Sequence, residues 1–156
     1  MSWLFESNEI EALPEDCVGF VYLITNVTNN RKYIGKKLAR FKTSKPPLKG
    51  RKNRRRGTKE SDWREYYGSN DELNEDIKQL GTENFKREIL YYCNSKAECS
   101  YIEAREQFRH KVLETPQYYN GHIQVRVHGS HIINKLSGTP APKIDVDKSH
   151  PLFEKK

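Results

Sequence analysis

Two tyrosines near the start of the chain have a spacing that would bring their phenols close together. Tyr22 lies in "GFVYLITN" and Tyr33 lies in "RKYIGKK", with the turn-forming residues Asn29 and Asn30 between them. Both runs are rich in β-branched and aromatic residues, so we predict a β-hairpin with one tyrosine in each strand. Tyrosines in strands most often serve packing. A phenol can also take part in proton transfer when neighbouring cations lower its pKa from about 10.

The second predicted strand adds a glycine and a cation to the same face. Side chains alternate along a strand, so Gly35 and Lys37 share a face with Tyr33. Gly35 leaves room for another backbone or a ligand to approach. Lys36, Lys37 and Arg40 are the cations close by in the sequence that can assist the phenols or bind a phosphate.

A strongly basic segment, residues 38–62, follows the hairpin. It holds ten lysines and arginines against Glu60 and Asp62, a net charge of +8, while the whole chain carries +7. Like charges at this density repel one another, and with the prolines and glycines they favour a mobile loop. Its charge is cationic rather than mixed, so we interpret it as a clamp for a polyanion rather than a solvated loop. On charge alone, a binder of RNA or of acidic proteins is a further alternative. The predicted DNA-binding residues are Lys36, Arg51, Lys52, Arg54, Arg55 and Arg56.

Two helices and a third strand are predicted after the basic segment. Residues 71–81, "DELNEDIKQLG", have helical apolar spacing, and 85–93, "FKREILYYC", alternate as a strand. A second helix over 95–114 opens with a capping box made by Ser95 and Glu98. Its predicted apolar stripe is Tyr101, Ala104, Phe108 and Val112, and its opposite face carries Glu103 and Gln107.

The composition indicates one domain without a membrane segment. Of the 156 residues, 35% are hydrophobic and 31% are charged, enough for one modest core. The three cysteines show neither a disulfide pattern nor zinc-ligand spacing. The acidic N-terminal stretch does not resemble a secretory signal, so we expect a cytoplasmic protein, or one in the host cytoplasm if a phage encodes it.

We divide the chain into three parts. Residues 1–17 are predicted to be an N-terminal extension and residues 18–135 the domain. Residues 136–156 are rich in Pro, Ser and Lys, which predicts a flexible tail or an arm that packs on a partner chain. Just before the tail, "HIQVRVH" alternates as an edge strand, whose histidines His122 and His128 share a face and can contact phosphate.

Several short motifs occur in an order that resembles the GIY-YIG nuclease superfamily. The elements "GFVY" (19–22) and "KYIG" (32–35) correspond to the two halves of the family's signature. They are followed in family order by "YYGS" (66–69), a helix ending at Gly81, "ENFKREIL" (83–90) and "YYN" (118–120). The resemblance covers residues 18–121 and lies nearest to the phage Seg-like, homing-type endonucleases.

The resemblance implies an α+β fold, with a small, mainly antiparallel three-stranded sheet flanked by helices. It also implies a metal-dependent DNA endonuclease that uses Mg²⁺, with Mn²⁺ as an alternative. Carried over, Tyr22 is the general base, Tyr33 its partner, Glu103 the metal ligand and Asn120 the family's asparagine. Glu106 is the rival metal ligand, because its surroundings align one turn later.

The chain departs from the family where an arginine usually stands on a helix after the second motif. Pro46 and Pro47 leave little room for a helix there. Arg40 is the preferred phosphate ligand, since arginine binds phosphate bidentately, and Lys37 or a cation of "RKNRRR" is the alternative. This departure supports a second hypothesis, a catalytically inactive DNA-binding protein of the same fold.

The resemblance also raises the question of how a target would be recognised. Homing-type relatives add a separate DNA-reading domain, for which the residues after 136 leave no room. Specificity would then come from the basic segment, the "HIQVRVH" stretch or a second subunit. Cutting both strands with one site would require a homodimer or successive nicks.

Overall fold

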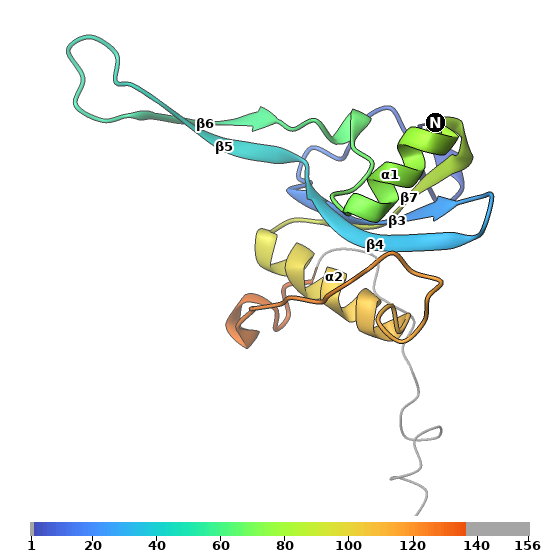
Figure 1. Cartoon of the computed structure of the whole chain (residues 1–156). Helices are drawn as coiled ribbons and strands as arrows, with labels where there is room; N and C mark the ends of the chain where they lie inside the picture. Colours follow the sequence, from blue (N-terminus) through green and yellow to red (C-terminus); the bar gives the residue numbers. More distant parts are fainter. Residues whose placement is uncertain (1, 137–156) are drawn as a thin grey trace, which may run out of the picture.

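A five-stranded sheet forms the centre of the protein, whose structure is a computed structural model that describes residues 2–136 (Figure 1). The strand bounds are Trp3–Phe5 (β1), Asn8–Glu9 (β2), Gly19–Asn26 (β3), Arg31–Leu38 (β4) and Phe85–Cys93 (β7). The strands lie in the order β2-β1-β7-β3-β4. β3 pairs antiparallel with β4 and β7, whereas β1 pairs parallel with β7. β4 is therefore an edge strand.

The α+β class agrees with the prediction, but the sheet is not the three-stranded antiparallel one that we expected. The two additional strands, β1 and β2, come from the N-terminal residues. Trp3 holds them in place: it is 2% exposed, and its indole N–H donates to the carbonyl of Trp63 at 2.7 Å. Strands of three and two residues are too short to leave a periodic pattern in the sequence.

The predicted hairpin of β3 and β4 is confirmed. Its turn uses asparagine side chains: Asn26 Oδ1 accepts from the amide of Thr28 at 3.0 Å, and Asn29 Oδ1 accepts from that of Arg31 at 2.9 Å. Asn30 takes a positive φ of 61°, which asparagine tolerates better than most residues. This turn fixes the register in which Tyr22 stands opposite Gly35.

Two helices cover opposite faces of the sheet (Figure 1). α1 (Asp71–Leu80) packs on the face that carries Tyr22, and α2 (Lys96–Arg109) on the face that carries Val21 and Ile34. The predicted Ser95 cap of α2 is present, since Ser95 accepts from the Glu98 amide, and at the start of α1 Asn70 accepts from the Leu73 amide. No helix in the described part of the chain is long and apolar enough to cross a membrane.

The face that α2 and the residues after it bury agrees only in part with the predicted one, because Ala104 and Val112 are buried as expected but the other two members of the stripe are not. Tyr101 and Phe108, expected in the apolar stripe, are 38% and 64% exposed, whereas Cys99, Ile102 and Glu106 are buried. The helix also ends at Arg109 rather than near residue 114. Apolar spacing alone could not predict the buried face, because α2 also buries polar side chains whose hydrogen-bond partners lie elsewhere in the fold. Gln107 Nε2, for example, donates to the carbonyl of Ile34 at 3.0 Å.

The basic segment is a β-ribbon rather than the mobile loop that we predicted. β5 (Arg40–Lys45) and β6 (Arg55–Glu60) pair antiparallel as a separate two-stranded sheet that projects from the body (Figure 1). We call residues 40–60 the basic arm. At its base a short 3₁₀ turn, Trp63–Glu65, anchors the returning chain through the buried Trp63. Cross-strand hydrogen bonds satisfy the backbone while the cations point into water.

The predicted edge strand over 122–128 is absent from the structure. These residues run as an extended, irregular segment toward a 3₁₀ turn at Gly129–His131. The edge of β4 is already occupied: Lys32 exchanges backbone hydrogen bonds with Gln117 and Tyr119. The remainder of the predicted tail, from residue 137 on, lies outside the described residues.

Candidate active site

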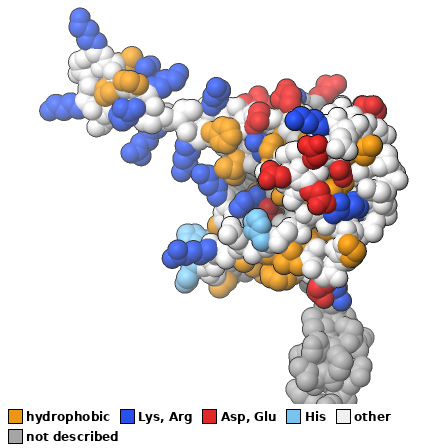
Figure 2. Space-filling view, in the orientation of Figure 1, with side chains coloured by type: hydrophobic (Ala, Val, Ile, Leu, Met, Phe, Trp, Pro, Cys, Tyr) orange, Lys and Arg blue, Asp and Glu red, His pale blue; other side chains and the backbone are white. Residues whose placement is uncertain are grey.

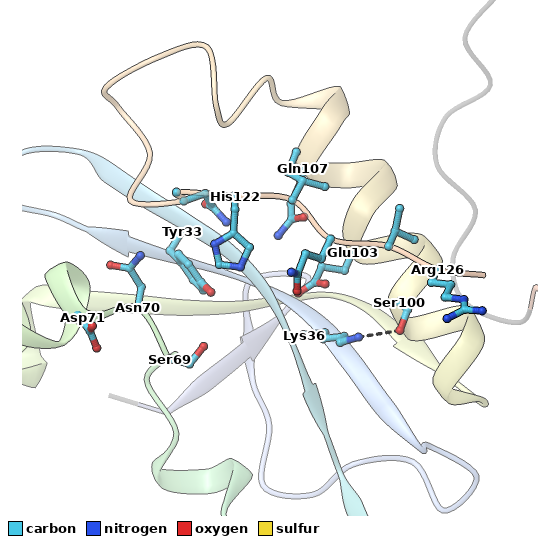
Figure 3. Close-up of a pocket in the computed structure, with 15 residues that line it drawn as sticks. Tyr33, Lys36, Ser69, Asn70, Asp71, Ser100, Glu103, Gln107, His122 and Arg126 are labelled. Atoms are coloured by element: carbon cyan, nitrogen blue, oxygen red, sulfur yellow. Dashed lines mark hydrogen bonds between the residues drawn. The ribbon is translucent and has the colours of Figure 1, made fainter.

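A pocket of about 830 Å³ lies where β4, the start of α1, α2 and residues 120–126 meet (Figure 3). Its side chains come from parts of the chain far apart in sequence. Those that concern its chemistry are Tyr33, Lys36, Ser69, Asp71, Glu103, Asn120, His122 and Arg126. The pocket therefore contains a phenol, carboxylates and several cationic or neutral donors.

The two tyrosines of the hairpin meet beside Gly35. Tyr22 stands directly opposite Gly35 in the register, and Tyr33 is its diagonal neighbour, with ring centroids 6.1 Å apart. A Cβ atom at position 35 would lie 2.5 Å from the Tyr22 hydroxyl and 2.8 Å from Cε1 of Tyr33. Only glycine lets both rings occupy these positions.

The two phenols differ in their access to the pocket. Tyr33 lines it, whereas Tyr22 is 1% exposed and hydrogen-bonds to Tyr66. Burial raises the pKa of Tyr22 well above its usual value, and the neighbouring Tyr66 and Tyr33 raise it further. Burial also raises the pKa of Tyr33, against a hydrogen bond with Ser69 that lowers it. Both phenols are therefore protonated at neutral pH.

Glu103 reaches the same pocket from the helix on the other face of the sheet. α2 packs against the edge strand β4, and Glu103 lines the pocket together with Lys36 of that strand (Figure 3). Burial raises the pKa of the Glu103 carboxyl, while the Lys36 ammonium, the Lys36 backbone N–H and His122 act to lower it. Glu103 also contributes to the raised pKa of both phenols, which places its charge near them.

Lys36 and Asn120 hold the edge of β4 in place around this carboxylate. Lys36 Nζ donates to Ser100 Oγ at 2.6 Å (Figure 3). Asn120 Oδ1 accepts from the amide of Ile34 at 3.1 Å, and its Nδ2 donates to the carbonyl of Ile34 at 2.8 Å. Asn120 thus completes the hydrogen bonding of an edge residue and fixes the following segment over the pocket.

Glu106, the rival carboxylate, points elsewhere. It is 2% exposed, and its oxygens lie 3.4 Å from Arg109 Nη1 and 3.4 Å from His110 Nε2. It does not line the pocket that contains Glu103. Glu106 is buried and already paired with neighbouring side chains of its own helix, so it stabilises the fold and is not available to bind a metal ion.

The structure does not bring the predicted phosphate ligand to the pocket. Arg40 is exposed at the start of β5, beside a separate hollow lined by Ala39 and Trp63. Lys37 is nearer, since its ammonium lies 4.1 Å from the ring centroid of Tyr66, but it pairs with Asp62 at 2.6 Å. It does not line the pocket either.

Arg126 lines the pocket although the sequence did not single it out. It follows His122 in the irregular segment and contributes an exposed guanidinium at the rim (Figure 3). No motif marks it, and its only sequence signal was its place in the basic, alternating "HIQVRVH" stretch.

The predicted DNA-binding residues fall in two places. Lys36 lies in the pocket, and the others lie on the basic arm, where Figure 2 shows many lysine and arginine side chains in blue. Arg55 and Arg56 belong to β6, while the other three occupy the arm's tip, residues 46–54. The net cationic surface thus extends well away from the pocket.

The donor set fits a lightly held divalent ion. No cluster of three or more His, Cys, Asp or Glu side chains suited to a metal exists among residues 2–136. In Figure 3 the two pocket carboxylates, Glu103 and Asp71, lie on opposite sides of Tyr33. Mg²⁺ commonly binds one or two carboxylates together with substrate phosphate oxygens and several waters, so Glu103 is the residue that would hold such an ion.

One protein-family model matches most of the chain. Residues 3–123 match the family described as "Putative endonuclease segE, GIY-YIG domain", a span that includes β1, both helices and Asn120. Neither curated proteins nor solved structures gave a significant match. Because the family match covers most of the chain, this protein belongs to the Seg-like family of GIY-YIG nucleases.

Proposed function

We propose that the protein is a metal-dependent endonuclease that hydrolyses phosphodiester bonds in duplex DNA. One observation carries the proposal: Tyr33, Lys36 and Glu103 line a single pocket, with the hydroxyl of Tyr22 close behind Gly35. A phosphodiester is anionic, so its hydrolysis needs positive charge beside the attacked phosphorus and a group that accepts a proton from water. The pocket offers both kinds of group.

The cations of the pocket are suited to hold the scissile phosphate. Lys36 and Arg126 enter from different sides of the pocket, and His122 lies between Tyr33 and Glu103 in Figure 3. We assign Arg126 the bidentate contact, in place of Arg40, because only Arg126 of the two lines the pocket. Lys36 then adds a second charge while its hydrogen bond to Ser100 limits its movement.

Glu103 is the proposed ligand of Mg²⁺ or Mn²⁺. Burial raises the pKa of its carboxyl, which means that a positive charge beside it would be favoured. When bound, the ion would neutralise charge on the phosphate as a Lewis acid. The carboxylate's position is fixed by the hydrogen bond from the Lys36 backbone, so it is oriented before any ligand arrives.

The phenols divide the remaining work. Tyr33 lines the pocket, so we assign it the direct contact with the phosphate or the attacking water. Tyr22 is the proposed general base, which requires its ionised form. Because burial raises the pKa of Tyr22, only a small fraction is ionised at neutral pH, and the reaction should be slow there.

A plasmid-nicking assay with Mg²⁺ tests the proposal. Glu103→Ala should abolish nicking, whereas the matched variant Glu106→Ala, three residues along the same helix, should lower thermal stability but still cut. Equal cutting by wild type and Glu103→Ala would remove the proposed chemistry. Salt-sensitive DNA binding by the wild type with no Mg²⁺-dependent product would support the alternative, a binding protein without nuclease activity.

One pocket cuts one strand at a time. A double-strand break would therefore require two copies on the DNA or two successive nicks. The mass of the protein–DNA complex distinguishes these: a homodimer doubles the protein mass on a single cleavage site. Linear product that appears only after nicked product would indicate successive cuts by one copy.

A further inference from the structure

The basic arm has no core of its own. Its strands β5 and β6 pair only with each other in the described part of the chain. Of residues 40–60 only Thr43 is partly buried, and the rest are exposed. An isolated two-stranded hairpin is only marginally stable in water, so a partner that contacts the arm would stabilise it.

The charge of the arm indicates what such a partner must carry. No acidic residue occurs from Arg40 to Lys59. In the ladder Lys45 stands directly opposite Arg55, and like charges in this position destabilise a strand pair. A polyanion between or beside them would relieve that repulsion and release its counterions. A second copy of the same arm would instead add to the repulsion.

One face of the arm continues toward the tyrosines of the body. Lys37 lies outside the pocket, 4.1 Å from the ring centroid of Tyr66, which packs on Tyr22, and 5.6 Å from that of Phe41, on β5. The alternation of strands places Thr43 on the same face as Phe41. This face, which we call the inner face, consists of Phe41, Thr43, Lys45, Arg55, Gly57 and Lys59.

Thr43 and Gly57 form the middle of the inner face. Gly57 is paired with Thr43, and a Cβ at position 57 would lie 3.3 Å from Thr43 Oγ1. Gly57 therefore leaves the hydroxyl of Thr43 open to an approaching group, while larger side chains rise on both sides. A threonine offers both a hydroxyl and a methyl group, which suit the edges of bases.

We infer that the arm lies in the major groove of the DNA beside the cleaved bond, with Thr43 against the base edges. The inference rests on the proposed function for its choice of DNA. Two strands are about 4.8 Å apart, so with side chains the ribbon fills a groove about 12 Å wide and not one about 6 Å wide. Its six-residue strands span about 20 Å, or about six base pairs.

Footprinting with dimethyl sulfate tests the groove. This reagent methylates guanine N7 in the major groove and adenine N3 in the minor groove. Without divalent ions, the wild type should protect guanine N7 over about six base pairs on one side of the cleavage position. A variant in which Asn-Gly replaces residues 44–56 should lose that protection. Adenine N3 protection, or a footprint unchanged by the shortening, would overturn the inference.

A matched pair of point variants tests the inner face without risk to the fold. Thr43→Val and Thr58→Val remove the same hydroxyl from the same ribbon, but Thr58 lies on the opposite face, paired with Lys42. In binding to a pool of random duplexes, Thr43→Val should change the selected base at one or two positions. Thr58→Val should select the same sequences as the wild type. Equal behaviour of the two variants contradicts the inference.

These measurements separate the two proposals. If the footprint depends on the arm but the protein never nicks DNA, the groove contact stands and the nuclease proposal is wrong. If the protein nicks DNA but its footprint does not change when the arm is shortened, the nuclease proposal stands and the groove contact is wrong. The free wild-type protein could also be a dimer that becomes a monomer when the arm is shortened, with an unchanged footprint. In that case the arm binds a second copy and the inference is wrong.

Discussion

The pocket and the basic arm both consist of cationic and polar residues, but they differ in how firmly the fold holds these side chains. In the pocket, Lys36 and Asn120 are tied by hydrogen bonds to Ser100 and Ile34, so their positions follow from the fold. On the arm the cations are exposed, and their hydrogen bonds, such as those from Arg54 to Ser44 and from Arg55 to the carbonyl of Pro46, stay within the arm itself. Chemistry needs fixed atoms, whereas attraction to a polyanion needs only charge that can reach it.

The largest effect is expected from a substitution in the pocket that should slow cleavage without weakening DNA binding. Glu103→Gln keeps the shape of the side chain and removes its charge, so the cleavage rate should fall by about a thousandfold or more. Duplex binding measured by fluorescence anisotropy without divalent ions should change less than about threefold. A parallel loss of affinity would mean that Glu103 supports the DNA-binding surface and not the reaction.

The arm should behave in the opposite way. Replacing Arg54, Arg55 and Arg56 by glutamine should weaken duplex binding by about ten- to a hundredfold and reduce the slope of log K against log salt by about 2 to 3. The single-turnover rate at saturating protein should stay within about threefold of wild type, because these side chains lie outside the pocket.

A charge-matched variant serves as the control for the arm. It carries glutamine at Lys78, Lys96 and Lys111, which are exposed and lie outside both the arm and the pocket. If this variant loses affinity and salt dependence to the same extent, net charge and not the arm determines binding.

The pH dependence of cleavage tests the role of the buried phenol, Tyr22. The pKa of Tyr22 is raised, so its ionised fraction grows with pH throughout the neutral range. If Tyr22 is the base, the single-turnover rate should rise about tenfold per pH unit from pH 7 to pH 9, and Tyr22→Phe should remove this rise. A rate that does not rise over this range and is lost in His122→Gln would assign the base to the imidazole instead.

The sequence predicted the placement of the two hairpin tyrosines and Gly35 better than the parts of the fold around them, for a physical reason. The hairpin register depends on local turn residues and on alternation, and these place Tyr22, Gly35 and Tyr33 together without help from distant parts of the chain. The helix caps at Asn70 and Ser95 are equally local.

Long-range contacts account for what the sequence did not predict. β1 depends on Trp3 finding Trp63, sixty residues away, and the buried face of α2 depends on partners for its polar side chains. The basic arm was misread because repulsion among its cations suggested disorder, whereas its backbone pairing overrides that repulsion. Arg126 carried no motif, since its place at the pocket follows from the path of an irregular segment.

The smallest effect is expected from single arginine substitutions, which test where the pocket ends and the basic arm begins. Arg126 lines the pocket and Arg40 stands at the base of the arm, so equal substitutions separate a phosphate clamp from a general cation. Arg126→Gln should lower the single-turnover rate about tenfold, with partial rescue by Arg126→Lys, because lysine keeps the charge but loses the bidentate geometry. Arg40→Gln should instead weaken binding slightly and leave that rate unchanged. The reverse result would return the phosphate contact to Arg40 and require the arm's base to move toward the pocket when DNA binds.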